Sequence, residues 1–182
     1  MTPDIPPIFL IGYMGCGKTT FGRALAKATG RDFIDLDFYI SQRFRASIPE
    51  IFADHGESGF RRMESAMLRE VGEFPGVVVA CGGGTPCFGS NIDYMLGRGP
   101  VVWLQASRRR LLERLLRGRQ RRPLLAGKTD AEVAAVIDEG LRAREPFYSR
   151  ASITFNGDRL ENRNQISASI DDFLREFQDL FA

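Results

Sequence analysis

Short runs of apolar residues recur along the chain, and longer segments with helical spacing separate them. The runs fall at residues 8–11, 33–36, 77–80, 101–104 and 153–155, and each predicts a strand. Because apolar side chains mostly fill successive positions rather than alternate ones, these strands are expected to be buried on both faces. This pattern is typical of a parallel sheet that helices cover.

Helices are expected between the strands. One is predicted over residues 18–29, where Phe21, Leu25 and Ala28 share a face and Gly30 provides a stop. Two capping boxes, at residues 47–50 and 129–132, mark further helix starts. Two more apolar stripes, one after Ser107 and one near the C-terminus, consist of Leu111, Leu112, Leu115 and Leu116 and of Ile166, Ile170, Phe173, Leu174 and Phe177.

The alternation of strand and helix predicts a three-layer α/β/α domain with a parallel sheet. We expect one domain over residues 1–182, because this length fits one and neither a linker nor a repeat interrupts the pattern. Ligands in such folds bind at the carboxyl ends of the strands, so segments 12–19, 35–37 and 82–84 should meet in one cleft. The polar, arginine-rich segment 118–128 fits a mobile loop.

Composition narrows the class of protein. Hydrophobic residues make up 43% of the chain and the formal net charge is +2, which gives no reason to expect a nucleic-acid partner. No apolar run approaches the roughly 20 residues of a membrane-spanning helix, and residues 1–7 are unlike a signal peptide. Cys16, Cys81 and Cys87 form no C-x-x-C pair, so we expect a cytoplasmic protein rather than a disulfide scaffold or zinc site.

Residues 12–19 read Gly-Tyr-Met-Gly-Cys-Gly-Lys-Thr and match the phosphate-loop pattern G-x-x-x-x-G-K-[ST]. Glycines let the backbone turn its N–H groups toward phosphate oxygens, and the helix that follows adds its positive N-terminal end. Lys18 would reach the β- and γ-phosphates of ATP, and the Thr19 hydroxyl would bind Mg²⁺. The position between a predicted strand and a predicted helix disfavours a chance match. The motif alone does not identify the acceptor of the phosphate.

Asp35 and Asp37 follow the second predicted strand. Strand alternation would place both carboxylates on the same side of the chain. One could orient water on the metal, and the other could accept a proton from an attacking hydroxyl. The alternative is that Asp37 only caps the next helix. The position at the carboxyl end of a strand favours the functional interpretation.

Three other features admit a structural interpretation as well as a functional one. Gly82-Gly83-Gly84 could let a ligand approach the backbone closely or could be a flexible turn. Arg61 and Arg62 fit a solvated helix face. Residues 108–122 hold eight arginines. Aromatic residues, which usually stack on single-stranded bases, are absent from that segment, so we favour an amphipathic helix followed by a lid over phosphates.

Together these motifs resemble the shikimate kinase family, within the nucleoside-monophosphate-kinase-like group of phosphate-loop proteins. The resemblance runs from about residue 8 to residue 174. Its motifs are Gly-Tyr-Met-Gly-Cys-Gly-Lys-Thr at 12–19, Asp-Leu-Asp at 35–37, Gly-Phe-Arg at 59–61, Gly-Gly-Gly at 82–84, Arg-Pro-Leu-Leu at 122–125 and Arg-Glu-Pro-Phe-Tyr at 144–148. The family's Asn-Pro-Leu-Tyr pattern reads Glu-Pro-Phe-Tyr at 145–148 here, a departure that could alter a loop near Arg144.

The resemblance implies a five-stranded parallel sheet in the order 2-3-1-4-5, a substrate-binding segment at about 37–64 and a lid at about 115–129. It implies transfer of the γ-phosphoryl group of ATP to the 3-hydroxyl of shikimate with Mg²⁺ present. It further implies a monomer whose partners are small molecules, with neither nucleic acid nor membrane.

The resemblance also implies a set of site residues. The catalytic residues would be Lys18, Asp37 and Arg122, and the metal would be held by Thr19 and, through water, Asp35. ATP would be bound by Gly15, Cys16, Gly17, Lys18, Thr19, Thr20, Arg114 and Arg122. Shikimate would be bound by Asp37, Arg61, Gly82, Gly83, Gly84 and Arg144, with the two arginines clamping its carboxylate. Arg114, or else Arg117, would stack on adenine.

Two alternatives stay open at the level of sequence. A kinase of another small hydroxy acid, such as gluconate, would share the ATP half of the site, so only a panel of substrates separates it from a shikimate kinase. An ATP-dependent regulatory or nucleic-acid-binding module would instead use the arginine-rich segment. Such a module would bind RNA or DNA with an affinity that falls steeply with salt.

Overall fold

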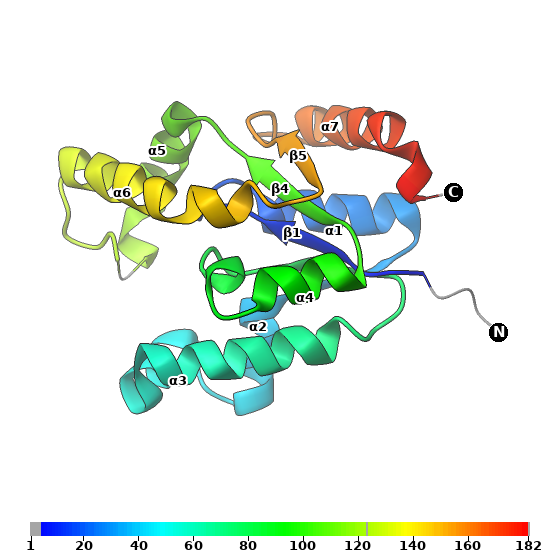
Figure 1. Cartoon of the computed structure of the whole chain (residues 1–182). Helices are drawn as coiled ribbons and strands as arrows, with labels where there is room; N and C mark the ends of the chain where they lie inside the picture. The colour runs from blue at the N-terminus through cyan, green and yellow to red at the C-terminus, as the bar shows by residue number, and fades with distance from the viewer. Residues whose placement is uncertain (1–4, 123, 182) are drawn as a thin grey trace.

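The computed structural model describes residues 5–122 and 124–181 and shows a five-stranded parallel sheet between helical layers (Figure 1). The strand order β2-β3-β1-β4-β5 confirms the expected one. The strands are β1 (Ile8–Ile11), β2 (Asp32–Asp35), β3 (Val77–Ala80), β4 (Val101–Gln105) and β5 (Ile153–Asn156). Residues 1–4, Ala182 and Pro123 of the motif at 122–125 lie outside the described residues.

Parallel pairing aligns the carboxyl ends of the central strands. Leu10 of β1 and Asp35 of β2 both pair with Ala80 of β3. The segments that follow these strands therefore leave the sheet next to one another. Every residue of β1 and β3 is buried, as expected for strands that are covered by helices on both faces.

Helices fill the connections between the strands. In the described chain they are α1 (Lys18–Thr29), α2 (Leu36–Phe44), α3 (Ile48–Val71), α4 (Asn91–Arg98), α5 (Arg108–Arg117), α6 (Asp130–Tyr148) and α7 (Arg163–Glu176). Figure 1 shows α1 beside α7 in one layer and α3 beside α4 in the other, and both pairs are in contact. Helices α5 and α6 also pack against each other. In Figure 1 they lie at the left of the molecule, away from the two chain termini at the right.

The helix starts expected from the sequence are confirmed. Ser47 with Glu50 and Thr129 with Glu132 form reciprocal capping boxes at the starts of α3 and α6. Each box satisfies backbone N–H groups that the first helical turn leaves without partners. Gly30 ends α1 in the left-handed conformation, with φ of 67°.

Aromatic packing fixes α1, the helix that follows the phosphate loop. The ring of Phe21 on α1 meets the ring of Phe173 on α7 edge to face, with centroids 5.3 Å apart. Phe155 of β5 packs against both rings, at 5.5 Å from Phe21 and 5.1 Å from Phe173. All three anchor α1 to the sheet, and the phosphate loop at its N-terminus is positioned with it.

The expected strand over residues 33–36 is one residue out of place at each end. β2 covers Asp32–Asp35 and α2 begins at Leu36, which is fully buried. The argument from strand alternation was therefore wrong. Asp35 ends a strand and caps α2 by accepting a hydrogen bond from Phe38 N at 3.3 Å, whereas Asp37 lies in the first helical turn. Leu36 could not fix this boundary from the sequence, because a buried apolar side chain fits the end of a strand as well as the start of a helix.

Two expected loops carry regular structure. The segment 118–128 includes a 3₁₀ turn over Arg119–Arg121, and the fully buried Leu125 anchors it to the protein. Residues 145–148 belong to the last turn of α6 and do not form a loop beside Arg144.

Candidate active site

The phosphate loop follows β1 and wraps around the N-terminus of α1. Gly12, Gly15 and Gly17 have φ of 139°, 82° and 107°, values that residues with a Cβ atom rarely adopt. Gly17 precedes α1 and supplies no side-chain cap. The N–H groups of the first helical turn therefore stay available to an anion, which the helix dipole also favours.

Two polar side chains at the start of α1 border this loop. Lys18 Nζ donates to Gly12 O at 2.8 Å and to Tyr13 O at 3.1 Å, which holds the ammonium group beside the loop. Thr19 Oγ1 donates to Asp35 Oδ2 at 2.8 Å. A hydroxyl oxygen from the first turn of α1 and a carboxylate oxygen from the end of β2 thus lie together next to the loop.

A cavity of about 380 Å³ opens along the phosphate loop. The residues expected to bind ATP that line it are Gly15, Gly17, Lys18, Thr19, Thr20, Arg114 and Arg122. Leu160 and Glu161, which the sequence does not single out, complete the wall. Cys16, which was also expected to bind ATP, is only 1% exposed and does not line this cavity. Its buried side chain is therefore not available to a ligand here. Three cationic side chains therefore border a cavity that backbone N–H groups also face, an arrangement suited to polyphosphate.

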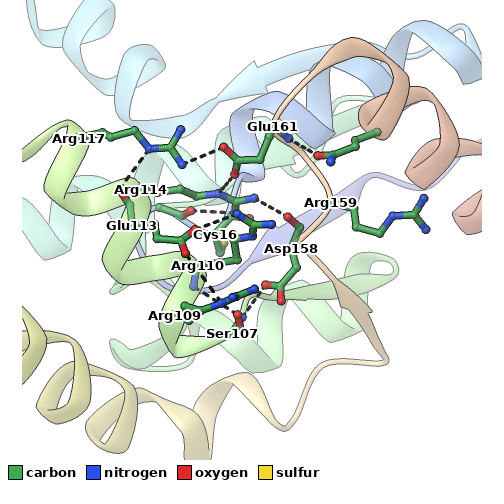
Figure 2. A network of polar contacts seen from close by, with 12 residues as sticks. Cys16, Ser107, Arg109, Arg110, Glu113, Arg114, Arg117, Asp158, Arg159 and Glu161 are labelled. Atoms are coloured by element: carbon green, nitrogen blue, oxygen red, sulfur yellow. Dashed lines mark hydrogen bonds and ion pairs between the residues drawn. The ribbon is translucent and has the colours of Figure 1, made fainter.

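Arg114 of α5 connects the phosphate loop with the segment after β5 (Figure 2). Its Nη1 donates to Gly15 O and Cys16 O, both at 3.2 Å, and its Nε donates to Glu161 Oε1 at 2.7 Å. Arg117 donates to the other oxygen of Glu161 at 3.0 Å. The Arg114 side chain is 13% exposed and that of Arg117 is 62% exposed. Of the two candidates for contact with adenine, Arg114 is the one held in the cavity wall.

Asp37 adjoins the glycine segment after β3. A Cβ atom placed on Gly82 would lie 3.2 Å from Asp37 Oδ1. Asp37 is an exposed residue as a whole, but desolvation by the surrounding protein, and then the charges of Glu64 and Asp35, raise the pKa of its carboxyl group to about 6. Asp37 is therefore ionised at neutral pH and still close enough to its pKa to act as a proton acceptor.

Glu64 of α3 is fully buried, and each of its two carboxylate oxygens accepts a hydrogen bond from another side chain. Its Oε2 accepts from Arg61 Nη1 at 2.7 Å, and its Oε1 accepts from Thr85 Oγ1 at 2.5 Å. A buried carboxylate is costly unless it is paired, so this pairing fixes the Arg61 guanidinium in place. The Arg61 side chain keeps 17% exposure, which leaves it able to meet a ligand.

Arg144 reaches the same region from α6. Its guanidinium lies over the ring of Tyr13, 5.2 Å from the centroid. Tyr148, one turn further along α6, is fully buried and donates its hydroxyl to Gly83 O at 2.6 Å. Burial raises the pKa of the Tyr148 hydroxyl, which keeps it a neutral donor. Helix α6 therefore positions both a cation and the backbone of the glycine segment.

Each of the three glycines after β3 approaches a different residue expected to bind the substrate: in order, Asp37, Arg144 and Arg61. A Cβ atom on Gly83 would lie 3.2 Å from Arg144 Nη1 and 3.6 Å from Met14 N of the phosphate loop. One on Gly84 would collide with Arg61 Nη2. The fold thus brings segments 35–37 and 82–84 together beside the phosphate loop at 12–19, as the rule for parallel sheets predicts.

The sequence patterns assign no role to four side chains of this region: Glu64, Thr85, Tyr148 and Glu161. Glu64 follows Arg61 by three residues, a spacing that puts both on one face of a helix and could have identified the pair. Thr85, Tyr148 and Glu161 contact residues far away in the chain, at separations of 21, 65 and 47 positions. Only the fold reveals those contacts.

In residues 5–122 and 124–181, no helix is long and apolar enough to cross a membrane. The same residues contain no group of three or more His, Cys, Asp or Glu side chains that could hold a metal ion by themselves.

Comparison with known proteins points to one family. Residues 14–175 match the family model described as shikimate kinase. A shikimate kinase of Phocaeicola vulgatus is 50% identical over 164 residues, which cover 90% of this chain and 94% of that protein. The crystal structure of a shikimate kinase from Bacteroides thetaiotaomicron has a TM-score of 0.92 at 44% identity and covers 95% of this chain and 98% of its own.

Two further solved structures resemble this chain to different degrees. A shikimate kinase from Acinetobacter baumannii in complex with shikimate has a TM-score of 0.82 at 32% identity, over 96% of this chain and 94% of that one. A gluconokinase from Sinorhizobium meliloti covers 97% of both chains, but with a TM-score of 0.55 and 16% identity. The second likeness shows a shared fold alone.

Proposed function

The chain belongs to the shikimate kinase family, and on that premise we propose how its cleft performs the reaction. The reaction transfers the γ-phosphoryl group of ATP to the 3-hydroxyl of shikimate, giving shikimate 3-phosphate and ADP, a step in the synthesis of chorismate and the aromatic amino acids. One observation carries the proposal for the site. A phosphate-loop cavity with three cations adjoins a glycine-lined region that holds two arginines and a carboxylate.

Shikimate is recognised through its single carboxylate and three hydroxyls. Arg61 and Arg144 bind the carboxylate, because guanidinium forks match its geometry. Their positions support this role: Glu64 holds Arg61 at 2.7 Å, and Arg144 rests on the ring of Tyr13. The glycines at 82–84 let the ring approach the backbone closely, since they present no side chain toward it.

Asp37 receives the proton of the attacking hydroxyl. The 3-hydroxyl oxygen forms a bond to the γ-phosphorus while the bond from that phosphorus to the β,γ-bridging oxygen breaks and ADP leaves. The hydroxyl proton passes to the carboxylate of Asp37, whose pKa of about 6 leaves it ionised at neutral pH. Asp37 also orients the hydroxyl, because an ionised carboxylate accepts its hydrogen bond.

Lys18, Arg122 and the loop N–H groups stabilise the negative charge on the transferring phosphoryl group. Arg122 belongs to residues 115–129, which we propose to act as the lid over ATP, and we propose residues 37–64 as the substrate-binding segment. Lid closure excludes water, which protects ATP from hydrolysis.

Thr19 and Asp35 fit a Mg²⁺ site. Their oxygens lie 2.8 Å apart beside the phosphate loop, and hard oxygen donors suit Mg²⁺. This ion usually takes few protein ligands and keeps its waters, which agrees with the lack of a larger acidic or histidine cluster in the described residues. When bound with ATP, it would supply positive charge to the β- and γ-phosphates. Asp35 would act on it through a water molecule.

We further propose a cytoplasmic monomer without a nucleic-acid partner. Several arginines of α5 and the lid are already engaged inside the chain, which supports this view. Arg108 binds Asp138 in two hydrogen bonds, and Arg119 binds Asp130 at 2.7 Å. A nucleic-acid surface would instead direct such cations outward to phosphates. The three cysteines are free thiols, as is usual in a reducing compartment.

An ADP-release assay with shikimate, gluconate and nucleoside monophosphates in parallel tests the function. We expect rapid ADP release with shikimate and almost none with the other acceptors or without an acceptor. Release with gluconate in place of shikimate would move the function to the alternative hydroxy-acid kinase. Equal release without any acceptor would indicate an ATPase.

A further inference from the structure

The guanidinium of Arg114 is bound along its edge on three sides (Figure 2). Besides its bonds to Glu161, Gly15 O and Cys16 O, its Nη2 donates to Asp158 O at 3.1 Å. The N–H groups of a guanidinium lie in its plane, so these bonds occupy the edge and leave the flat faces for stacking. Arg114 is therefore held as a platform in the wall of the nucleotide cavity.

Arg114 also braces the phosphate loop. The C=O and N–H of a planar trans peptide point in opposite directions. By binding Gly15 O and Cys16 O at 3.2 Å, the guanidinium fixes the orientation of two successive loop peptides.

Glu161 is the acidic side chain that holds Arg114 in this position. Its Oε1 accepts from Arg114 at 2.7 Å and its Oε2 from Arg117 at 3.0 Å, while its backbone N–H donates to Gln165 Oε1 at 3.0 Å. Asn162, the next residue, caps α7 by accepting from Gln165 N. Glu161 is thus fixed between α5 and α7.

A carboxylate in the wall of a polyphosphate cavity needs an explanation, because it repels the ligand's charge. Two arginines neutralise Glu161 here and leave the cluster with a net positive charge. Of the bonds described for Glu161, the one to Arg114 leads to another residue of the cavity wall. Its electrostatic cost to phosphate binding is offset if it serves to hold Arg114.

We propose that Glu161 is a positioning residue for nucleotide binding and that it acts through Arg114. It fixes the guanidinium as a platform for adenine and as a brace for the phosphate loop. The inference rests on the proposed contact of Arg114 with adenine. Without the carboxylate, Arg114 gains rotamer freedom that the nucleotide must then restrict, and nucleotide affinity falls. Shikimate affinity does not change.

The variant Glu161→Gln tests this role, because it keeps the shape and one acceptor but removes the charge. We expect the Kd of ADP, measured by calorimetry, and the KM for ATP to rise about tenfold, the size expected for loss of a charge-assisted hydrogen bond. The KM for shikimate should stay within about twofold. A residue that only supported folding would lower the melting temperature and leave the ratio of the two KM values unchanged.

Asp172→Asn is the matched control. Asp172 of α7 also lies between two arginines, Arg175 at 3.3 Å and Arg159 at 3.8 Å, and it does not line the nucleotide cavity. We expect this variant to bind ADP as the wild type does. In an Arg114→Ala background, Glu161→Gln should change the Kd of ADP by less than about twofold, because the two residues act as one unit.

Unchanged ADP affinity in Glu161→Gln would overturn the proposal, and so would a full effect in the Arg114→Ala background. An equal loss of ADP affinity in Asp172→Asn would also overturn it, since the effect would then be one of general surface charge. Failure of the proposed function is distinguishable, because the wild type itself would then release no ADP with shikimate.

Discussion

Asp37 and Glu64 are both carboxylates of the cleft, and their different surroundings give them different roles. Glu64 is fully buried and spends both oxygens on Arg61 and Thr85, so it holds a cation in place. Asp37 keeps solvent access, and its pKa is raised to about 6 in part by the charge of Glu64. The buried carboxylate therefore has a second effect: it makes Asp37 a better proton acceptor near neutral pH.

The activity should depend on the ionisation of Asp37. We expect kcat/KM for shikimate to rise with pH through about 6, because only the ionised form accepts the hydroxyl proton. The free energy of unfolding should change with pH in the opposite sense and fall as the pH rises. A raised pKa means that the folded state binds the proton more tightly, so the contribution of Asp37 to stability is lost as the pH rises toward 6.

The variant Glu64→Gln provides a check on the cause of the Asp37 shift. Removing its negative charge should move the midpoint of the pH profile to lower pH. A profile that is flat from about pH 5 to 8 in the wild type would contradict the role of Asp37 as proton acceptor.

The carboxylate clamp can be tested at Arg144. We expect Arg144→Ala to raise the KM for shikimate by about 10²-fold, as for loss of a charge-assisted pair, and to leave the KM for ATP within about twofold. Arg142→Ala is the control, since Arg142 is an exposed arginine on the same helix. An unchanged KM for shikimate in Arg144→Ala would remove Arg144 from the substrate site.

At the scale of elements, the turn after β3 adjoins three of the side chains that we propose to bind shikimate. Its first glycine adjoins a carboxylate and the next two adjoin the guanidinium groups of Arg144 and Arg61. Tyr148 of α6 fixes the middle peptide through its bond to Gly83 O. Polar side chains of three helices, α2, α3 and α6, therefore all lie against this turn.

Gly84→Ala tests the contact between this turn and Arg61. Gly84 has φ of −95° and ψ of −10°, which alanine adopts readily, but the added Cβ would collide with Arg61 Nη2. Displacing Arg61 also disturbs its pair with the buried Glu64, so we expect the KM for shikimate to rise about tenfold and the melting temperature to fall.

Gly97→Ala is the matched control for the turn. Nothing lies within 4 Å of a Cβ atom at Gly97 in α4, so this change should leave both KM values as they are and stabilise the helix by up to about 1 kcal/mol. If Gly84→Ala binds shikimate like the wild type, the turn is not part of the substrate site.

The elements that depend on local patterns could be predicted from the sequence. The capping boxes at Ser47 and Thr129 and the phosphate loop are examples, since each depends on residues within a few positions. The boundary between β2 and α2 could not, because the buried Leu36 suits a strand or a helix equally. Short helices such as α4 (Asn91–Arg98) have too few turns for a clear apolar period.

At the scale of the whole molecule, the fold places the glycine segment after β3 beside the phosphate loop, which also lines the cavity that we propose for the nucleotide. The apolar runs predict five buried strands, but they do not define the strand order, which came from the family resemblance. Contacts over long separations, such as Arg114 with Glu161 and Tyr148 with Gly83, follow from that order and from no local pattern. The segment between α5 and α6, which we propose as the lid, shares one cavity with the loop through Arg122 and Lys18.

The lid's part in catalysis can be tested with Arg122→Ala. We expect kcat to fall about 10²-fold or more, because Arg122 would stabilise the transferring phosphoryl group, while the KM for shikimate changes little. Arg109→Ala is the control, since the Arg109 side chain is 79% exposed on α5. A kcat equal to that of the wild type in Arg122→Ala would show that the lid only covers the site.

The most direct test of the account is ³¹P NMR of the purified chain with MgATP and shikimate. The account predicts that the γ-phosphate signal of ATP is replaced by one phosphate monoester on the 3-oxygen of shikimate, with one ADP formed for each ester. A spectrum that shows only inorganic phosphate and ADP, or unchanged ATP, would contradict it.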